Sequence, residues 1–355
     1  MIYPKFPSAG DTLGICAPSA GVGGKLDSFN LSIEALASEG FNIKESASVR
    51  NDAYPSAPAD VRAAEFNAML EDDSVSMVMC ASGGDYCIET LPHINQALVS
   101  SKPKWFCGYS DPTAIEMLLT TKLDIATIYG FNAGGFDWRP LHEFQNKGLA
   151  VLRGEIPEQS SYEFYSSKGF DDDTLTYEMD APVKWELFVP LSSLDPNNNT
   201  DYECHITNDY LASSTSLDVT GRLIGGCIDV IDCLVGTPFE DLEGFCARYA
   251  GDGLIWFFDN FSLDPLQLQY ALRKLQLKGL LDNARAIIIG RTLLPGEATD
   301  EDYLYHIGRV LADTGVPLIW NADIGHTKPS FTLINGAIGH FTFDHGQATL
   351  SMELK

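Results

Sequence analysis

The chain has 355 residues, of which 45% are hydrophobic and 20% are charged, as in folded globular proteins with room for two ordinary domains. The formal net charge of −26 repels phosphate backbones and anionic lipids, so nucleic acids and membrane surfaces are poor partners and a small neutral or zwitterionic substrate fits better. The N-terminal sequence lacks the apolar core of a signal peptide, and no run approaches the roughly 20 apolar residues of a membrane span, so we expect a cytoplasmic chain.

The first 150 residues alternate short apolar runs with helical patterns, and we assign residues 1–150 to an N-terminal domain. The expected strands cover residues 11–19, 41–46, 74–82, 104–110 and 125–131, and the expected helices cover residues 26–39, 60–71, 86–99 and 112–122. This alternation predicts an α/β fold with a mainly parallel sheet flanked by helices. Because ligands bind beyond the carboxyl ends of parallel strands, functional residues should directly follow strands.

The sequence becomes polar and acidic between about residues 157 and 205, and we predict that residues 151–205 are a linker with an insertion that forms a lid or a binding loop. The insertion contains aromatic residues that either stack on a substrate or pack on the protein, namely Tyr177, Trp185, Phe188 and Tyr202. Of these, Trp185 is the candidate for substrate binding.

Regular patterns return after residue 205, and we assign residues 206–355 to a second, mixed α/β domain. Strand-like runs at 253–260, 284–292 and 317–325 alternate with helices near 265–280 and 302–313. The tail at 336–354 alternates apolar and polar residues around a turn, which predicts a β-hairpin.

The segment WFCGYSDPT, from Trp105 to Thr113, combines a buried strand with the abrupt start of a helix. Asp111 suits the N-cap of that helix, and Pro112 suits its first position. Ser110 would then stand on the turn with its hydroxyl above the sheet, while the amide of Asp111 faces a developing oxyanion, as in a nucleophile elbow. Taken alone, the segment fits an ordinary strand-to-helix turn better than a nucleophile elbow.

A second glycine-rich turn, Ser-Gly-Gly-Asp at 82–85, closes another strand of the same predicted sheet. Its glycines let the backbone approach a ligand and offer N–H groups. The amide of Gly84 is therefore a candidate oxyanion donor, and Gly83 and Asp85 are candidates for contacts with the substrate. In isolation, a glycine turn before a helix explains the segment equally well.

A nucleophilic serine needs a base, and one of the seven histidines is well placed for that role. His326 lies in GHTKP, immediately after an apolar run, where a loop at the end of a strand would hold an imidazole at the ligand edge. His93 and His306 fall inside helical patterns, and His340 and His345 belong to the tail hairpin, which predicts surface or packing roles for these four.

The third partner should be a carboxylate that orients the imidazole and stabilises its protonated form. Asp259 ends the strongly apolar run LIWFF, where a lone carboxylate is costly unless it has a partner. Asp264 precedes Pro265 and is more simply the N-cap of the next helix. We therefore predict Ser110, Asp259 and His326 as the catalytic residues.

These residues resemble a known family, the Ser-Glu-His peptidases that include LD-carboxypeptidases and microcin-immunity hydrolases. The resemblance runs through APSAGV near the start, SGGD, GYSDPT, GRLIGG, the strand before Asp259, and GHTKP. It implies a two-domain α/β protein, usually a homodimer, that hydrolyses an amide bond next to a terminal carboxylate without a metal or cofactor. The substrate would be a small peptide or peptide conjugate, such as a muropeptide tetrapeptide. It also implies that Ser110 is the nucleophile, His326 the general base, and the amides of Gly84 and Asp111 the oxyanion donors.

The acid departs from the family pattern, because the family generally has Glu in a Leu-Glu-Asp setting and this chain has Phe258-Asp259-Asn260. Asp is one methylene shorter, so the backbone must bring Asp259 close enough for a hydrogen bond of about 2.6 to 3.2 Å to His326.

Three alternatives to the carboxypeptidase remain open. One is a microcin-immunity-type hydrolase of peptidyl or aminoacyl nucleotides, and another is a ligand-binding homologue whose catalysis was weakened by Asp259. The third is a cysteine hydrolase using Cys80 or Cys107, although both lie inside apolar runs. The eight cysteines show no spacing that suggests zinc, and we expect most to be buried thiols, with disulfides a minor alternative.

Overall fold

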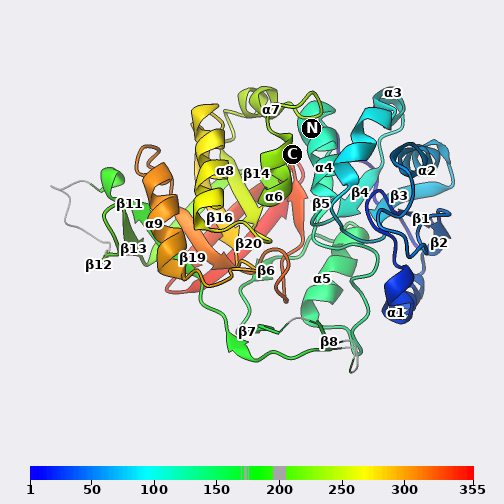
Figure 1. Cartoon of the computed structure of the whole chain (residues 1–355), viewed down its shortest axis with the longest axis horizontal. Coiled ribbons are helices and arrows are strands. Elements are labelled where there is room, and N and C mark those ends of the chain that lie inside the picture. The colour runs from blue at the N-terminus through cyan, green and yellow to red at the C-terminus, as the bar shows by residue number, and fades with distance from the viewer. Residues whose placement is uncertain (169, 172–173, 175, 195–204) are drawn as a thin grey trace.

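The computed structural model describes residues 1–168, 170–171, 174, 176–194 and 205–355. Two sheets lie side by side, each flanked by helices, and the chain ends lie close together, with the Tyr3 hydroxyl donating to the Lys355 carbonyl at 2.7 Å (Figure 1). No helix in the described ranges combines the length and apolar character needed to cross a membrane. This arrangement agrees with the predicted α/β fold with a parallel-rich sheet and a second mixed sheet.

The first sheet comes mainly from the N-terminal part of the chain. Its described strands are β1 (Thr12–Cys16), β2 (Asn42–Glu45), β3 (Val75–Cys80), β4 (Trp105–Gly108), β5 (Thr127–Tyr129) and β18 (Leu333–Asn335). They follow the order β18-β5-β4-β3-β1-β2, in which β18 alone is antiparallel to its neighbour. The accompanying helices are α1 (Leu26–Ser38), α2 (Ala59–Glu71), α3 (Gln96–Ser101), α4 (Thr113–Met117) and α5 (Glu143–Leu152).

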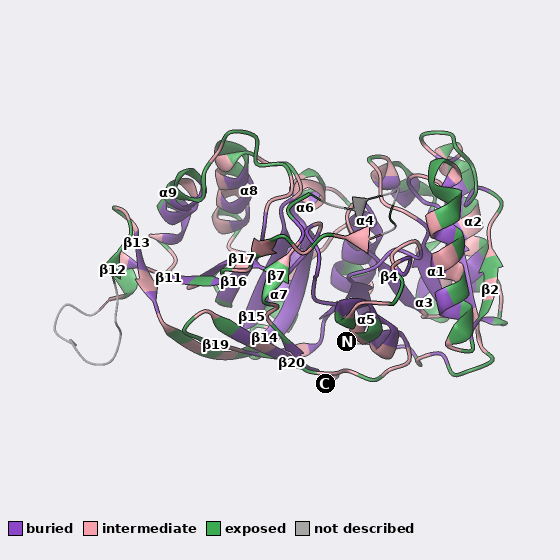
Figure 2. Ribbon diagram, turned by 90° about the horizontal axis from the view of Figure 1, so that it is seen from below, coloured by how far each residue is buried: buried purple, intermediate pink, exposed green. Residues whose placement is uncertain are grey.

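Alternation of side chains explains why helices cover both faces of this sheet. In β3, Met77 and Met79 join the core cluster that contains Phe29 of α1, whereas Val78 joins the cluster that contains Phe66 of α2. Successive residues of a strand point to opposite faces, so α1 and α2 cover opposite sides. Figure 2 shows buried residues concentrated in the strands and on the inner sides of the helices.

The second sheet follows the order β12-β13-β11-β17-β16-β15-β14-β19-β20-β6 within the described residues. Its strands are β6 (Gln159–Ser160), β11 (Glu186–Pro190), β12 (His205–Ile206), β13 (Leu211–Ser214), β14 (Ser216–Cys227), β15 (Leu254–Asp259), β16 (Ala284–Gly290), β17 (Leu318–Ala322), β19 (Ile338–Asp344) and β20 (Gln347–Glu353). The four strands β14 to β17 are parallel, and the remaining pairs are antiparallel.

The helices of the second part are α6 (Ile228–Leu234), α7 (Leu242–Arg248), α8 (Pro265–Leu277) and α9 (Asp300–Leu311). Asp264 caps α8 as predicted, because its carboxylate accepts from the amides of Leu266 and Gln267. Two short antiparallel pairs lie between β6 and β11 in the sequence, β7 (Phe164–Tyr165) with β10 (Ala181–Pro182) and β8 (Phe170–Asp171) with β9 (Thr176–Tyr177). Shorter helical turns are η1 (Gly23–Lys25), η2 (Cys87–His93), η3 (Leu118–Lys122) and η4 (Leu191–Ser193).

The two sheets share their hydrophobic cores. Each of the two core clusters contains residues of both sheets, for example Phe106 with Trp256 in one and Ile15 with Phe257 in the other. Strand β18 belongs to the C-terminal part of the chain but completes the first sheet. The buried side chain of Asn335 at its end donates to the Gly225 carbonyl and accepts from the Gly225 amide at 2.8 Å. Packing therefore holds the carboxyl edges of the two sheets in a fixed relation.

The local predictions differ from the structure at a few places. The helix expected at 86–99 is split into η2, which contains Pro92, and α3, because proline removes a backbone donor inside the turn. The tail hairpin is confirmed by the antiparallel pair β19 and β20. Within the insertion predicted at 151–205, β11 lies inside the second sheet between β13 and β17. The domain boundaries themselves stay a prediction.

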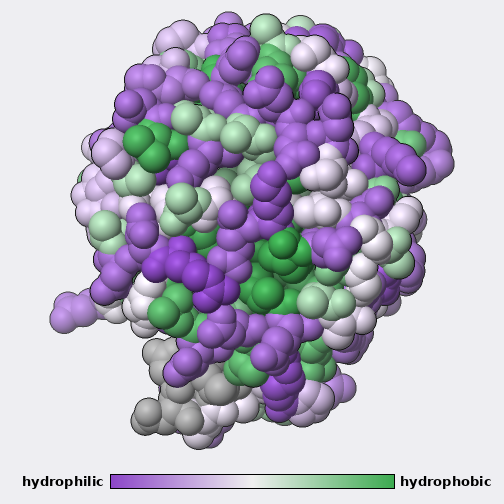
Figure 3. Space-filling model, turned by 90° about the vertical axis from the view of Figure 1, so that its right-hand side faces the viewer, coloured by the Kyte–Doolittle hydropathy of each residue, from purple (hydrophilic) through white to green (hydrophobic). Residues whose placement is uncertain are grey.

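One side of the molecular surface is largely hydrophilic. Figure 3 looks onto the side that carries the first sheet and shows mostly hydrophilic side chains with hydrophobic ones in small groups between them.

The described cysteines are free thiols, and all of them are buried except Cys233. Cys204 lies outside the described residues.

Candidate active site

Ser110 stands on the turn between β4 and α4. Its backbone has φ of 70°, in the left-handed region that non-glycine residues adopt only where the surrounding structure enforces it. The turn is held by a hydrogen bond from the Thr113 amide to the Ser110 carbonyl at 2.9 Å. This strained strand-to-helix turn has the geometry of a nucleophile elbow.

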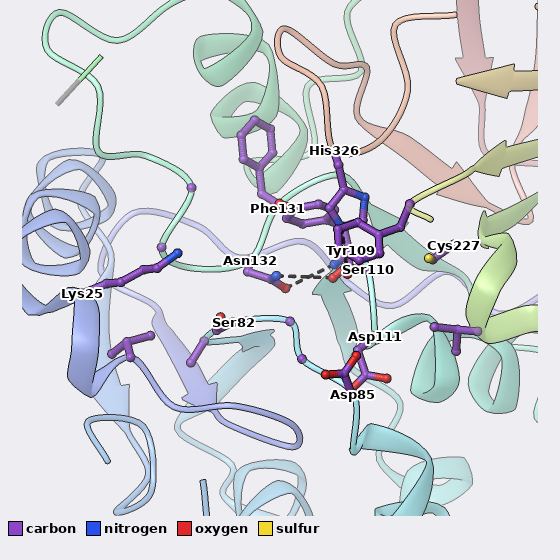
Figure 4. Close-up of a pocket in the computed structure, with 18 of the residues that line it drawn as sticks. Lys25, Ser82, Asp85, Tyr109, Ser110, Asp111, Phe131, Asn132, Cys227 and His326 are labelled. Atoms are coloured by element: carbon purple, nitrogen blue, oxygen red, sulfur yellow. Dashed lines mark hydrogen bonds between the residues drawn. The ribbon is translucent and has the colours of Figure 1, made fainter. Parts of the chain in front are cut away.

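His326 faces Ser110 from the segment that leads from β17 toward β18. Its Nε2 lies 2.9 Å from Ser110 Oγ. The imidazole contacts two aromatic rings, that of Tyr109 with ring centroids 5.1 Å apart and that of Phe261 with centroids 4.6 Å apart. Figure 4 shows His326, Tyr109 and Ser110 converging at one wall of a cavity. The base and the nucleophile are therefore within hydrogen-bond reach.

Asp259, the last residue of β15, lies on the other side of the imidazole. Its side chain is completely buried, and its carboxylate oxygens lie 2.8 and 3.0 Å from His326 Nδ1. Burial acts to raise the pKa of Asp259, but the charge and hydrogen bond of His326, the hydrogen bond of Tyr129 and the charge of Lys328 together outweigh burial, so this pKa lies below its ordinary value. With Nδ1 protonated, the ring donates to Asp259 and its Nε2 accepts from Ser110.

The backbone compensates for the shorter acid. Gly325 has φ of 93°, and a Cβ at this position would overlap the carboxylate of Asp259. The segment before His326 therefore packs directly onto the acid, and only glycine allows this close approach. This close packing is how an aspartate at the end of β15 reaches the imidazole without the additional methylene of glutamate.

Tyr129, at the end of β5, is a member of the site that sequence reasoning missed. Its hydroxyl donates to Asp259 at 2.5 Å and accepts from the Ser110 amide at 3.4 Å. Burial, together with the negative charge of Asp259, raises the pKa of Tyr129, which keeps the phenol protonated as a donor. The available signal was its position at the carboxyl end of a predicted strand in the same sheet as Ser110.

We expect Tyr129→Phe to lower kcat about tenfold, because the variant removes one hydrogen bond to the buried carboxylate and leaves its packing in place. Steady-state hydrolysis rates measure the effect. Tyr249→Phe is the matched control, since the Tyr249 hydroxyl donates to Asp124 at 2.7 Å far from Ser110 in the chain. Equal rates for wild type and Tyr129→Phe would contradict this positioning role.

The two predicted oxyanion donors belong to segments close to the nucleophile. A Cβ added to Gly83 would lie 3.3 Å from Ser110 Oγ, so the 83–84 backbone approaches the nucleophile closely. Among the described residues, the amides of Gly84 and Asp111 have no protein acceptor. Both amides are thus available to a developing oxyanion beside Ser110.

Gly84 requires its glycine for two reasons, a φ of 145° and a Cβ position that would overlap Ser19 Oγ. We expect Gly84→Ala to displace the amide and lower kcat by about 10² to 10³, the typical effect of losing one oxyanion donor. Gly10→Ala is the control, because Gly10 has φ of 91° but open space around its Cβ position. If Gly84→Ala retained full kcat, the amide of Gly84 would have no role in stabilising the oxyanion.

The predicted N-cap role of Asp111 is wrong. Helix α4 begins at Thr113 after Pro112, and no side chain caps it. Instead, the buried Asp111 carboxylate accepts from the Ser19 hydroxyl and from the Cys87 amide, the latter at 2.8 Å. Burial raises the pKa of Asp111, opposed by the hydrogen bond from Ser19. The aspartate therefore ties the nucleophile turn to the loop after β1 and to η2.

A cavity of about 640 Å³ opens beside the triad and is lined by Ser110 and His326. The predicted contact residues Gly83 and Asp85 also line it, and Asp85 accepts a hydrogen bond from the Tyr54 hydroxyl. Its lining is rich in carboxylates, with Asp85, Asp111, Asp137 and Asp229, and its cationic side chains are Lys25 and Lys328 among the described residues. The volume suits a short peptide or a conjugate of similar size.

The aromatic residues of the insertion have different positions. Trp185 is buried in the core, where its Nε1 donates to Asp323 at 2.9 Å and its ring stacks on Phe341, and it does not line the cavity. We therefore do not assign it to substrate binding. Phe188 is also part of the core, whereas Tyr177 lines the cavity. Tyr202 lies outside the described residues.

The remaining candidates do not join the triad. His306 bonds to Gln269, and His340 bonds to Asp218, each at 2.8 Å. Cys80 and Cys107 are fully buried in β3 and β4, and burial raises the pKa of both thiols, which disfavours the thiolate that a cysteine hydrolase needs.

Comparison with known proteins agrees with this architecture. The chain matches the model of the LD-carboxypeptidase N-terminal domain over residues 13–130 and that of the LD-carboxypeptidase C-terminal domain over residues 220–340. A probable murein peptide carboxypeptidase of Bacillus subtilis is 26% identical, with 94% of this chain and 89% of the relative covered. The microcin C7 self-immunity protein MccF of Escherichia coli is 25% identical, with 97% and 94% covered. The crystal structure of an MccF-like protein from Bacillus anthracis superposes with a TM-score of 0.79 and 21% identity over the whole of both chains.

Proposed function

Because the chain belongs to the LD-carboxypeptidase family, we propose that it is a serine carboxypeptidase that hydrolyses an amide bond next to a terminal carboxylate. The observation that carries the proposal is the continuous contact from Asp259 through His326 to Ser110, at 2.8 and 2.9 Å. A base oriented by a buried acid and in contact with a serine is the arrangement that nucleophilic amide hydrolysis requires.

In the first half of the reaction, His326 Nε2 takes the proton from Ser110 Oγ as the oxygen attacks the scissile carbonyl carbon. The amides of Gly84 and Asp111 donate to the oxyanion that forms, and Asp259 stabilises the imidazolium. His326 then returns the proton to the leaving nitrogen. The C–N bond breaks, the terminal residue leaves as a free amine, and Ser110 carries the acyl group.

In the second half, water occupies the position of the departed amine and His326 removes its proton. Attack on the acyl-enzyme forms a second oxyanion at the same two amides, and its collapse releases the carboxylate product and restores the Ser110 hydroxyl. All proton transfers use one imidazole, which Asp259 and Tyr129 keep in place.

We propose a muropeptide tetrapeptide-like peptide as the substrate, in keeping with the curated relative named a probable murein peptide carboxypeptidase. The short distances within the triad favour this hydrolase over a non-catalytic binding homologue. A cytoplasmic location stays a prediction from the sequence, and a homodimer stays a prediction from the family resemblance. Light scattering after size-exclusion chromatography tests the dimer.

Hydrolysis of peptidyl or aminoacyl nucleotides is a second candidate, favoured by an aromatic side chain at the cavity. Tyr177 lines the cavity, and its ring centroid lies 5.6 Å from that of Trp138. Aromatic faces of this kind can stack on a nucleobase. A relative of similar length is a microcin self-immunity protein, which agrees with this alternative.

The experiment that tests the proposal incubates the purified chain with a tetrapeptide that ends in a free carboxylate and with an aminoacyl nucleotide analogue. Mass spectrometry follows release of the terminal residue, and a fluorophosphonate probe followed by peptide mapping identifies the reactive serine. We expect release from the tetrapeptide and labelling of Ser110. Cleavage of the nucleotide conjugate alone would favour the second candidate, and labelling of another residue would refute Ser110 as the nucleophile.

A further inference from the structure

Lys328 is a buried cation in the wall of the catalytic cavity, and the mechanism above does not use it. Lys328 is 6% exposed, and it lines the cavity that contains Ser110 and His326. Its Nζ donates to the Gly325 carbonyl at 2.8 Å and to the Ser330 hydroxyl at 3.0 Å. An ammonium group carries three protons, so these two contacts leave one proton for a further acceptor.

The Tyr109 ring contacts both the ammonium of Lys328 and the imidazole of His326. Lys328 Nζ is 4.5 Å from the centroid of the Tyr109 ring, and that centroid is 5.1 Å from the centroid of the His326 ring. Tyr109 directly precedes the nucleophile. The carboxylate of the leaving residue lies one residue beyond the scissile carbonyl, a span of about 3.3 to 3.6 Å, and Ser110 and Lys328 line the same cavity.

The cavity lining carries more anionic than cationic side chains, so a cation near Ser110 matters for binding a substrate carboxylate. Four aspartates line the cavity and would repel a substrate carboxylate, while the cationic side chains among its described lining residues are Lys25 and Lys328. Lys25 is exposed, and Figure 4 shows it across the cavity from Ser110. Lys328 is therefore the cation placed to meet a carboxylate next to the scissile bond.

We propose that Lys328 is the specificity-determining residue that binds the terminal carboxylate of the substrate, through a charge-assisted hydrogen bond from its third ammonium proton. The inference rests on the proposed function, since it names the group that recognises the residue to be released. It explains how an acidic cavity accepts a substrate that ends in a negative charge.

The surroundings of Lys328 predict a pH dependence. Burial lowers its pKa to about 8, opposed by the nearby carboxylates of Asp259 at the end of β15 and Asp137 in the segment before α5. Tyr109 after β4 and His326 beside it face the same ammonium. Lys328 is charged below its pKa and neutral above it, so the carboxylate contact is present below about pH 8 and is lost as the pH rises.

The experiment compares two peptides that differ only at the terminus, one with a free carboxylate and one with a carboxamide. For wild type, we expect KM for the carboxylate peptide to be about 10- to 100-fold below KM for the carboxamide, the range of a charge-assisted hydrogen bond. This preference should disappear above pH 8 without any substitution. In Lys328→Met, the carboxylate KM should rise to the carboxamide value at all pH values, with the carboxamide KM unchanged.

Lys147→Met is the matched control, because Lys147 also lies over a tyrosine ring, Tyr162 at 5.7 Å, but does not line the cavity. It should keep the wild-type preference. An equal loss of kcat on both peptides in Lys328→Met would indicate a structural role and overturn the proposal. Loss of the preference in Lys25→Met, with Lys328→Met unaffected, would also overturn it.

A binding measurement separates this proposal from the proposed function. Calorimetry compares the carboxylate peptide with Ser110→Ala and with the double variant Ser110→Ala, Lys328→Met, so it does not depend on turnover. We expect the second substitution to raise Kd about 10- to 100-fold. An unchanged Kd overturns the role of Lys328, whereas a wild type that binds but hydrolyses neither peptide counts against the hydrolase alone.

Discussion

Replacing Ser110 with alanine should lower kcat by about 10⁴-fold or more while the protein stays folded, because the nucleophile and the base act as a unit. The variant removes the hydroxyl that contacts His326 Nε2 at 2.9 Å and keeps the remaining side-chain volume. Hydrolysis of the tetrapeptide under single-turnover conditions measures the loss, and circular dichroism with thermal melting checks the fold.

The matched control is Ser101→Ala, which removes an exposed hydroxyl that bonds the Leu98 carbonyl at the end of α3. It should leave kcat unchanged. Because alanine at 110 retains the two oxyanion amides, a residual rate above the uncatalysed reaction is expected. A rate within tenfold of wild type would contradict the assignment of Ser110, whatever the behaviour of the control.

The second large effect is expected for Asp259→Asn, which should lower kcat about 10⁴-fold, as in other triads where an amide replaces the acid. The amide can donate to Nδ1, which favours the wrong imidazole tautomer for accepting the Ser110 proton. It also removes the charge that stabilises the imidazolium. Asp264→Asn is the control, since asparagine caps a helix about as well as aspartate does.

Asp259→Glu tests whether the site is built for the shorter acid. Glutamate is the usual acid of the family, but here Gly325 packs against the carboxylate and the Tyr129 hydroxyl bonds it at 2.5 Å. We expect kcat below wild type and above Asp259→Asn, because the additional methylene must displace the segment before His326. Wild-type activity in Asp259→Glu would mean that this packing does not select for aspartate.

The positions of the three triad residues were predictable because each follows a strongly apolar strand. Ser110, Asp259 and His326 lie at or just beyond β4, β15 and β17, where the ligand edge of a parallel sheet is expected. Their mutual distances were not predictable. Those distances depend on how two sheets pack, and that packing involves residues far apart in the chain.

The contact between Tyr129 and Asp259 could not be predicted from the sequence. Its partner Asp259 is 130 positions away, and nothing near Tyr129 in the sequence indicates a buried carboxylate.

Trp185 was predicted as a site residue, but it does not line the cavity. A tryptophan in a polar insertion suggested a substrate contact, but strand β11 carries the chain back into the second sheet and its neighbour Trp185 into the core. Packing of the two sheets decided the position of Tyr129, and pairing of β11 with distant strands decided that of Trp185.

The route of the chain through β17, His326 and β18 has a consequence for the assembly of the enzyme. A chain cut between α5 and β6 would give two fragments, and the first would lack β18, the outer strand of its own sheet. Neither fragment would hold the nucleophile and the base together. Mixed fragments would regain hydrolysis only after β18 adds to the edge at β5, so activity would report complementation of the split protein.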